Sequence, residues 1–426
     1  MLPSGVAVVR VSGTETRNVL HAMTGEVPPS RYAKLTTFRG RDGSILDRGL
    51  CLFFPAPASF TGEDCAELHL HGGRAVVSAI LECLSGFSGL RTAEAGEFTR
   101  RAFLNGKIDL TGAEALSDLI AAETEAQRRF ALANSGEAHR RLYESWRQRL
   151  IRSRAMIEAE LDFADEADVP GSISGTIWGD LQNLVKEIEG HIAGYQSAEI
   201  IREGFRVVIL GAPNAGKSSL LNALARRDVA IVTDEPGTTR DILEVNLDLG
   251  GVKVVLADTA GIREAGGQVE AIGIDRSLQR AREADLVLLL EDISAPMPFN
   301  GVPDRPTIRI GNKADLLEGK ADVAGYDCVL SAKTGEGLNL LVDLLRKAAE
   351  AHVPQAGDIL PFRARHLALL NEAVEALTLA IERHDEDLEL RAENLRLAAT
   401  ALGRIHGKID VEDLLDAIFS TFCIGK

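Results

Sequence analysis

The stretch that most constrains the fold of this 426-residue chain lies near its middle. An apolar run at residues 205–210 is followed by Gly-Ala-Pro-Asn-Ala-Gly-Lys-Ser at 211–218 and by an apolar, helix-prone run at 219–225. This order predicts a strand, a phosphate-binding loop and a helix, because backbone N–H groups of the loop and the helix N-terminus must converge on one phosphate chain. We expect Lys217 to reach the β- and γ-phosphates and Ser218 to ligate Mg²⁺. An ordinary glycine turn before a helix is the alternative, which the motifs further along the chain exclude.

Two later loops predict that the base is guanine. Residues 312–315 read Asn-Lys-Ala-Asp and follow a predicted strand that ends at Ile310. The Asp315 carboxylate can accept from both the ring N–H and the exocyclic amine of guanine, a pair of donors that adenine lacks. Residues 331–333, Ser-Ala-Lys, follow the next strand and would lend backbone donors to the guanine oxygen. Together these loops specify GTP.

Two segments between these loops have the character of nucleotide switches. Residues 258–261 read Asp-Thr-Ala-Gly, so that Asp258 can organise the Mg²⁺ shell and the Gly261 N–H can sense the γ-phosphate. Thr239, in the earlier segment 237–241, can close on Mg²⁺ and the γ-phosphate only when GTP is bound. The five nucleotide-binding elements are therefore present and in order.

The position after Gly261 lacks the glutamine with which Ras-like enzymes orient the attacking water, because Ile262 stands there. A different group must orient the water. The nearby polar candidates, each of which could equally be exposed switch surface, are Glu264, Gln268 and Glu270.

Composition limits the class of protein. With 45% hydrophobic and 26% charged residues the chain is typical of a soluble globular protein, and its length fits two or three domains. The formal net charge of −16 opposes sequence-independent attraction to nucleic-acid backbones. We expect a cytoplasmic protein that does not enter membranes, since no apolar run approaches the ~20 residues of a membrane span and the five cysteines form no C-x-x-C pair.

Hydrophobic periodicity divides the chain into four segments. A small α+β module at 1–105 is followed by a helical segment at 106–198, alternating strands and helices at 199–353, and helices again at 354–426. The third segment predicts a doubly wound α/β nucleotide-binding domain. Helical segments on both sides of it indicate that this domain is inserted in a helical domain, which the proximity of domain termini permits.

Individual elements follow from the same patterns. In the first two segments we expect strands at 6–11, 49–54 and 65–70, a helix at 74–84, a helix face made by Leu142, Trp146, Leu150, Ile157 and Leu161, and a break in the helices at 165–179. In the third segment we expect strands near 205–210, 243–249, 252–257, 285–290, 306–310 and 327–330, and helices near 216–226, 268–283 and 336–350. Gly250 and Gly251 predict a hairpin within that segment.

Over nearly its whole length the chain resembles the MnmE (TrmE) family of tRNA-modification GTPases. The specific motifs are Phe-Thr-Gly-Glu-Asp at 60–64, His-Gly-Gly at 71–73, the stretch 96–110 that begins Gly-Glu-Phe-Thr-Arg-Arg, and the terminal Cys-Ile-Gly-Lys at 423–426. The resemblance implies a Ras-like P-loop GTPase domain inserted in a helical domain, with a small folate-binding and dimerisation domain before it. Two features depart from the family. The residues that form its first strand, before residues 2–5, are missing here, so we expect either that the true start of the chain lies further upstream or that the module is weakened. Ala95 stands where proline is common in the family.

The resemblance also implies how GTP is bound and hydrolysed. It implies activation by K⁺-dependent dimerisation of G domains, with K⁺ held by Asn214, Thr233, Glu235 and Thr238 in place of an arginine finger, and with Glu270 orienting the water. Mg²⁺ would be ligated by Ser218 and Thr239. The full nucleotide-binding set comprises Asn214, Ala215, Gly216, Lys217, Ser218, Ser219, Thr233, Thr238, Thr239, Asp258, Thr259, Ala260, Gly261, Asn312, Lys313, Asp315, Ser331, Ala332 and Lys333.

A second site is implied for 5,10-methylenetetrahydrofolate, or a formyl-tetrahydrofolate analogue. The family's folate-binding positions correspond to Arg10, Glu67, Lys107 and Lys426, where a basic residue can face the glutamyl carboxylates and an acidic residue the pterin N–H groups. Cys423 is implied as a nucleophile or redox thiol. From the residues alone these positions are surface charges and an ordinary tail cysteine, and His69 and His71 are structural histidines rather than a metal pair.

The implied activity is modification of C5 of the tRNA wobble uridine with an aminomethyl or carboxymethylaminomethyl group. A homodimer of this chain would act with an FAD-dependent protein of the MnmG (GidA) family, as a heterotetramer. FAD belongs to that partner because this chain has no G-x-G-x-x-G at a strand–helix junction. The alternative is an RNA-binding or ribosome-assembly GTPase switch, which predicts a basic accessory domain and no folate site.

Overall fold

The computed structural model describes residues 3–135, 137–162, 174–231, 244–258, 278–297, 299, 301–317, 324–353, 358–383, 387–407 and 419. The chain forms two compact units. Unit 1 comprises Met1–Ser117, Arg140–Glu144 and Thr400–Lys426, and unit 2 comprises Asp118–His139 and Ser145–Ala399. None of the helices in the described part of the chain combines the length and the hydropathy of a membrane span.

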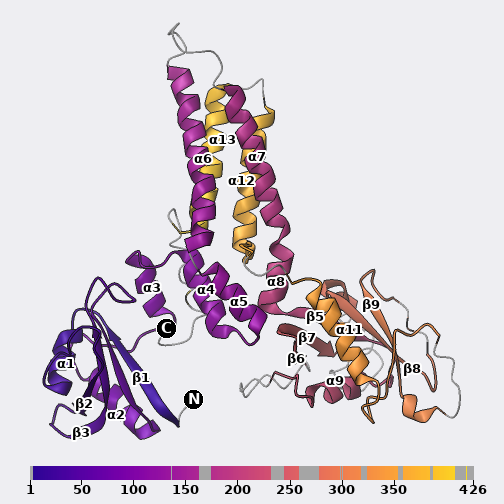
Figure 1. The fold of residues 1–426 in the computed structure, drawn as a ribbon, viewed down its shortest axis with the longest axis horizontal. Helices are drawn as coiled ribbons and strands as arrows, with labels where there is room; N and C mark the ends of the chain where they lie inside the picture. The colour runs from indigo at the N-terminus through magenta and orange to yellow at the C-terminus, as the bar shows by residue number, and fades with distance from the viewer. Residues whose placement is uncertain are drawn as a thin grey trace, which may run out of the picture. The chain divides into compact units, whose positions relative to one another are not determined.

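Unit 1 is built on an antiparallel sheet (Figure 1). Its strands are β1 (Ser4–Ser12), β2 (Lys34–Arg39), β3 (Ile45–Phe54) and β4 (Cys65–Gly72), in the order β1-β4-β3-β2. Side chains of α1 (Thr16–Thr24) and α2 (Arg74–Ser85) join those of the sheet in one core. The predictions of β1, β3, β4 and α2 are confirmed, whereas α1 and β2 had not been predicted.

The opposite face of this sheet is partly open. Val8 and Leu50 each pair with His69, and Leu50 also pairs with Leu35, so these side chains form a row across four strands. Leu35 is 63% exposed and Val8 is 47% exposed. This row is more apolar than a solvated sheet face requires.

Helices α3 (Glu97–Leu104) and α4 (Leu110–Ala121) follow the sheet, and a small core joins them to Phe419 near the end of the chain. Gly96 precedes α3 with φ of 68°, and a Cβ there would lie 2.4 Å from the Phe419 carbonyl oxygen. Only glycine tolerates both this conformation and this approach. The family motif at 96–110 therefore fits against the carboxyl-terminal part of the chain.

The helical part of unit 2 contains α5 (Glu125–Asn134), α6 (Glu137–Asp162), α7 (Ser174–Ala193), α8 (Tyr195–Glu203), α12 (Ala364–Glu382) and α13 (Leu388–Ile405). The four long helices α6, α7, α12 and α13 form a bundle (Figure 1). The predicted core face of α6 is confirmed, because Trp146, Leu150 and Ile157 are buried. The predicted break at 165–179 is wrong from Ser174 onward, where α7 runs through both Gly175 and Gly179.

The other part of unit 2 is a mixed six-stranded sheet. Its strands are β5 (Phe205–Leu210), β6 (Glu244–Leu249), β7 (Val252–Asp258), β8 (Leu286–Asp292), β9 (Thr307–Asn312) and β10 (Cys328–Val329), in the order β10-β9-β8-β5-β7-β6. Every neighbouring pair is parallel except the hairpin of β6 and β7. All six predicted strands are confirmed to within two residues at each end.

Helices cover both faces of this sheet. Leucines of α9 (Lys217–Ala225) and α11 (Leu338–Glu350) share one core with Val207 and Ile209 of β5, while Val208 and Leu210 join the core on the other face. Burial of successive side chains on opposite faces is typical of a parallel strand in a doubly wound fold. Helix α9 and helix α11 match their predictions, and the helix expected near 268–283 lies mostly outside the described residues.

Candidate functional site

The phosphate loop joins the end of β5 to the start of α9. At Gly211 a Cβ would lie 2.2 Å from the Leu290 carbonyl oxygen, and at Gly216 it would lie 2.3 Å from the Asn312 side-chain nitrogen. Gly216 also has φ of 99°, in the region that favours glycine. The loop backbone is thus packed tightly against two neighbouring strands, as a preformed phosphate cradle requires.

The charge of this loop suits an anion. The Lys217 ammonium donates to the carbonyl oxygens of Gly211 at 2.8 Å and Ala212 at 3.0 Å, so its charge lies across the loop. Helix α9 begins at Lys217 with Ser218 as its second residue, and its N-cap Gly216 provides no side-chain cap. The N–H groups of the first helical turn and the positive end of the helix dipole therefore point toward the loop.

Asn312 ties the guanine loop to the phosphate loop. Its side-chain amide donates to the Ala215 carbonyl oxygen at 2.8 Å, and its oxygen accepts from the Ala332 N–H at 3.0 Å. Asn312 is only 2% exposed. One buried amide thus holds together three loops that are far apart in the sequence.

The base-specifying carboxylate is also held in place. The buried Ser331 hydroxyl donates to Asp315 at 2.6 Å, which orients the carboxylate that the sequence predicts to bind guanine. Lys313 has a left-handed backbone, and its ammonium lies 2.5 Å from Asp292. Lys333, the last residue of the predicted Ser-Ala-Lys loop, is exposed.

Asp292 is a residue of this site that the sequence did not single out. Burial acts to raise its pKa, but hydrogen bonds from Lys313 and Ser294 outweigh burial and lower the pKa. The carboxylate is therefore charged when it pairs with Lys313. Its place at the carboxyl end of β8, the edge where ligands bind in such sheets, was the available signal.

The remaining predicted nucleotide residues fall into two groups. Asn214 is exposed with φ of 63°, Ser219 is exposed at the start of α9, and Asp258 is the last residue of β7, paired with Ile209 of β5. The others lie outside the described residues, namely Thr233, Glu235, Thr238, Thr239, Thr259, Ala260, Gly261 and Glu270.

The predicted folate residues of unit 1 are partly brought together. Arg10 and Glu67 are paired neighbours on β1 and β4, with Arg10 Nε 3.0 Å from Glu67 Oε1, and Glu67 Oε2 lies 3.2 Å from His69 Nε2. Lys107 lies against the 60–64 loop, since a Cβ at Gly62 would be 3.2 Å from its Cε. Lys426 and Cys423 lie outside the described residues.

A carboxylate and guanidinium network, not predicted from the sequence, fastens the two family motifs to each other. Glu63 accepts from the Ser12 hydroxyl and from Arg101, both at 2.9 Å, and Arg101 also donates to Glu97. Burial acts to raise the pKa of Glu97, but hydrogen bonds from Arg91, the Glu94 N–H and Arg101 lower it to about 2. The opposite charges in the motifs were the only signal in the sequence.

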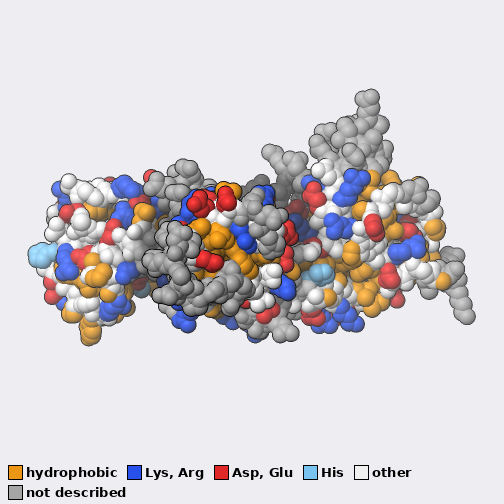
Figure 2. All heavy atoms as spheres, turned by 90° about the horizontal axis from the view of Figure 1, so that it is seen from above, with side chains coloured by type: hydrophobic (Ala, Val, Ile, Leu, Met, Phe, Trp, Pro, Cys, Tyr) orange, Lys and Arg blue, Asp and Glu red, His pale blue; other side chains and the backbone are white. Residues whose placement is uncertain are grey.

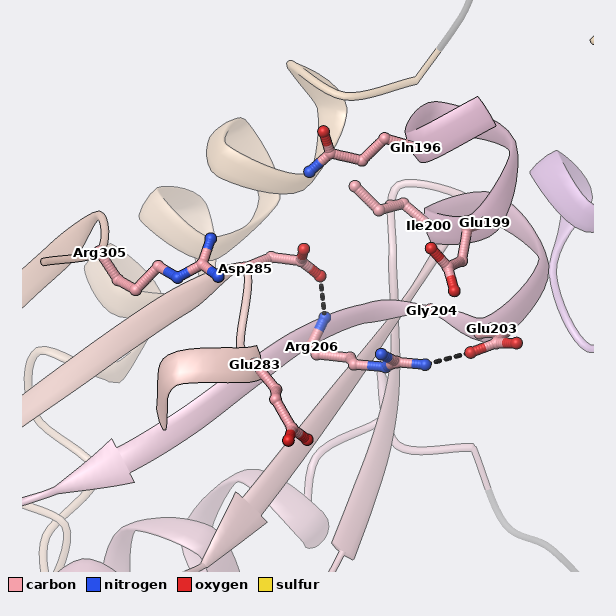
Figure 3. A pocket seen from close by; sticks show the side chains of 9 residues that line it. All are labelled: Gln196, Glu199, Ile200, Glu203, Gly204, Arg206, Glu283, Asp285 and Arg305. Atoms are coloured by element: carbon pink, nitrogen blue, oxygen red, sulfur yellow. Dashed lines mark hydrogen bonds and ion pairs between the residues drawn. The ribbon is translucent and has the colours of Figure 1, made fainter. Parts of the chain in front are cut away.

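A cavity of about 220 Å³ lies at the opposite edge of the unit 2 sheet from the phosphate loop (Figure 3). It opens where α8 enters β5 and where β8 begins, and it is lined by Gln196, Glu199, Ile200, Glu203, Gly204, Arg206, Glu283, Asp285 and Arg305. Asp285 accepts from the backbone N–H of Arg206 at 2.8 Å, and the Arg206 side chain pairs with Glu203. Because it is remote from the phosphate loop, this cavity is not the nucleotide site.

The surface shown in Figure 2 carries basic and acidic side chains interspersed with each other. On this face of the described residues the basic side chains do not gather into one area. This distribution agrees with the weak sequence-independent attraction to nucleic acid expected from the net charge of −16.

A mainly parallel sheet whose carboxyl edge carries a phosphate loop, an Asn-Lys-x-Asp loop and a Ser-Ala-Lys loop defines a P-loop GTPase. The family model described as "MnmE helical domain" matches residues 110–423, and "GTP-binding protein TrmE N-terminus" matches residues 1–107. The chain belongs to the MnmE family of tRNA modification GTPases, which confirms the resemblance found in its sequence.

Individual relatives agree with this family assignment. Proteins named tRNA modification GTPase MnmE are 67% identical in Chelativorans sp. (strain BNC1), 61% in Mesorhizobium japonicum and 58% in Brucella ovis. Each alignment covers 100% of this chain, and 96%, 97% and 96% of the respective relative. Among solved structures, Aquifex aeolicus Era bound to GDP and AlF4⁻ is 24% identical over 42% of this chain and 68% of that chain, with a TM-score of 0.27, which is too low to support an argument.

Proposed function

We propose that this chain is the K⁺-activated GTPase of a complex that modifies C5 of the tRNA wobble uridine. In this proposal it uses a tetrahydrofolate one-carbon donor and acts with an FAD-dependent MnmG (GidA) type partner. One observation carries the proposal: a single chain combines a GTP site held together by Asn312 with a separate sheet on which Arg10 and Glu67 form a partly exposed pair. A simple GTP-binding switch has no need of the second feature.

For GTP and Mg²⁺ the residues present fit the ligands. The cradle at residues 211–218 excludes any side chain at Gly211 and Gly216, and Lys217 already spans it. Ser218 and Asp258 stand at the ends of neighbouring elements where a Mg²⁺ shell would form. When bound, Mg²⁺ would neutralise charge on the β- and γ-phosphate oxygens.

Activation by K⁺ is supported by the geometry of Asn214. Its left-handed backbone and exposure leave the side-chain oxygen outside the tightly packed part of the loop. An amide oxygen is a suitable ligand for K⁺, and a cation there would offset charge that develops between the β- and γ-phosphates. Thr233, Glu235 and Thr238 are proposed to complete the shell, and Glu270 to orient the water.

The folate site is proposed at Arg10, Glu67, Lys107 and Lys426. The Arg10 side chain is 42% exposed and that of Glu67 is 23% exposed, so an incoming ligand can reach both groups. A guanidinium can hold a glutamyl carboxylate, and a carboxylate can accept from pterin N–H groups. Cys423, the fourth residue from the end of the sequence, is proposed to act as a nucleophile or redox thiol there.

A homodimer is proposed to form through unit 1. The row of Leu35, Leu50 and Val8 across the sheet leaves apolar surface exposed that a second copy would cover. The heterotetramer with the partner and the cytoplasmic location are proposed with it. So are the four segments of the chain, with their three boundaries at 105, 198 and 353. Substitution of Val8 by Glu should shift the mass measured by light scattering toward the monomer.

Calorimetric titration with 5-formyl-tetrahydrofolate tests the folate site. We expect saturable binding to the intact chain and a weakening of about tenfold or more in Arg10→Ala, because a charged hydrogen bond is lost. Arg39→Ala, on the edge strand β2 of the same sheet, is the matched control. Lack of saturable binding to the intact chain would favour the alternative, an RNA-binding or ribosome-assembly GTPase switch.

A further inference from the structure

The hairpin of β6 and β7 connects the two predicted switch segments. The segment 237–241 precedes β6, and the Asp-Thr-Ala-Gly segment begins at Asp258, the last residue of β7. The two strands are paired without interruption from Glu244 and Ala257 to Leu249 and Val252. An antiparallel ladder of this length spans about 20 Å, so it reaches without a break from the end that carries the switch segments to the turn.

The turn of this hairpin contacts the N-terminal end of α5, in the helical part of the chain. The backbone N–H of Ala126 donates to the carbonyl oxygen of Gly251 at 3.0 Å. The Gly251 N–H in turn donates to Asp248 at 2.7 Å, which fixes the shape of the turn. A backbone hydrogen bond therefore joins α5 to the end of the hairpin farthest from the nucleotide.

An ion pair lies beside this hydrogen bond. Lys253 Nζ of β7 is 2.6 Å from Glu123 Oε2, and the two side chains are 17% and 26% exposed. Glu125, two residues further along, instead pairs with Arg128 and Arg129 of its own helix, where all three side chains are 45% to 67% exposed. A partly buried pair between distant segments is screened less than exposed pairs within one helix.

Gln127 connects the same helix end to α8, the helix that precedes the phosphate-loop strand β5. Its side-chain oxygen accepts from the N–H groups of Glu123 at 2.8 Å and Thr124 at 3.1 Å, which completes a capping box. Its side-chain nitrogen donates to the Arg202 carbonyl oxygen at 2.9 Å, near the end of α8. Since α8 leads directly into β5, one helix end contacts both the hairpin between the switches and the helix that precedes the phosphate-loop strand.

We propose that these contacts, the α5 latch, couple the predicted switch segments, through the hairpin of β6 and β7, to helix α5 in the helical part of unit 2. The α5 latch is defined by Glu123, Ala126 and Gln127 on one side and by Gly251, Lys253 and Arg202 on the other. Coupling is reciprocal: a latch whose strength differs between the GDP and GTP states must also change the relative affinity for these two nucleotides. The inference does not depend on K⁺ or folate. Its nucleotide readout uses only the GTPase, and its second readout rests on the proposed wobble-uridine modification, which wild-type cells must show in the same experiment.

Charge reversal tests the α5 latch in the full-length chain. Glu123→Lys and Lys253→Glu, singly and together, are compared by their dissociation constants for GDP and for a non-hydrolysable GTP analogue, and by the modified wobble nucleosides of complemented cells. Each single variant should change the ratio of the two dissociation constants about fivefold or more and should lower wobble modification. The double variant, which restores an ion pair of opposite polarity, should recover both.

Arg129→Glu is the matched control, because it also reverses one charge on α5, but at a side chain that is 67% exposed and pairs with Glu125 of its own helix. Circular dichroism checks that every variant is folded, and Glu123→Gln replaces Glu123→Lys if the reversal prevents folding. Single variants that keep the wild-type ratio, a folded double variant that recovers neither property, or a changed ratio with normal wobble modification would each overturn the proposal.

Discussion

The side-chain nitrogen of Asn312 lies 2.8 Å from the carbonyl oxygen of Ala215, a residue ninety-seven positions earlier in the chain. Through this bond the loop that specifies guanine is fixed to the loop that cradles the phosphates. Recognition of the base and of the phosphates is therefore one structural unit, and damage to the bond should affect both.

Replacement of Asn312 by Ala should raise the dissociation constants for GTP and GDP by about 10- to 100-fold, because it leaves the buried Ala215 carbonyl oxygen and Ala332 N–H unpaired. Fluorescent-nucleotide titration measures the change. Asn339→Ala, at an exposed position on α11, serves as the control and should bind as the wild type does. Wild-type affinity in Asn312→Ala would show that the bond is dispensable.

Replacement of Asn214 by Ala should reduce the hydrolysis rate in KCl about tenfold or more, toward the rate in NaCl, because the proposed K⁺ shell loses its amide ligand. Steady-state phosphate release in the two salts measures this effect. Asn222→Ala, exposed on α9, is the matched control. Equal wild-type rates in Na⁺ and K⁺ would contradict K⁺ activation itself.

Replacement of Glu270 by Ala should lower single-turnover GTP hydrolysis by about 100-fold or more while GTP binding stays close to normal, because a water-orienting group acts mainly in the transition state. Glu264→Ala and Gln268→Ala, at the other two candidates, should hydrolyse GTP at close to the wild-type rate. An unchanged rate in Glu270→Ala would show that the assignment of the water-orienting residue is wrong, and loss of hydrolysis in Glu264→Ala or Gln268→Ala would identify the residue that takes this role.

The helical bundle should lose stability as the pH falls. Burial, reinforced by the charge of His366, lowers the pKa of His191 to about 4. The folded state thus binds fewer protons than an unfolded histidine with a pKa of about 6.5, so its stability is full above that pH and declines toward pH 4. Between pH 7.5 and pH 5 the free energy of unfolding should fall by up to about 2 kcal/mol from this residue.

Both tryptophans, Trp146 and Trp178, lie in the bundle, and the Trp146 ring is 5.3 Å from that of His191. Urea unfolding followed by tryptophan fluorescence therefore reports on this part of the chain. His191→Phe should show a smaller pH dependence, and His21→Gln, at an exposed position, should behave as the wild type. An unchanged pH dependence in His191→Phe would exclude His191 as the cause.

Replacement of Cys423 by Ser should leave GTP hydrolysis intact and abolish wobble modification, since the proposed thiol chemistry is separate from the nucleotide site. Mass spectrometry of tRNA nucleosides from complemented deletion cells measures the modification. Cys83→Ser, on α2, is the control. Modified uridine at the wild-type level in Cys423→Ser would show that the thiol is dispensable.

The local pattern of apolar residues was sufficient to predict the strands of the nucleotide-binding sheet, because these strands are apolar, short and separated by clear turns. It was not sufficient for β2, where only Phe38 of six residues is fully buried, so the alternation is too weak to identify a strand. It also failed at the start of α7, because the cost of glycine in a helix is offset there by burial of Ile177, Leu181 and others in the bundle.

The sequence by itself determined the phosphate loop, the guanine loop and their order, because phosphate and base recognition need particular residue types within a few contiguous positions. It also carried the family motifs at 60–64 and 96–110. Only the tertiary structure decided that Asn312 binds Ala215, that Glu63 binds Arg101 and that Glu123 binds Lys253. Each of these bonds joins segments far apart in the chain, and which polar side chains meet depends on the packing of whole elements, which local sequence does not encode.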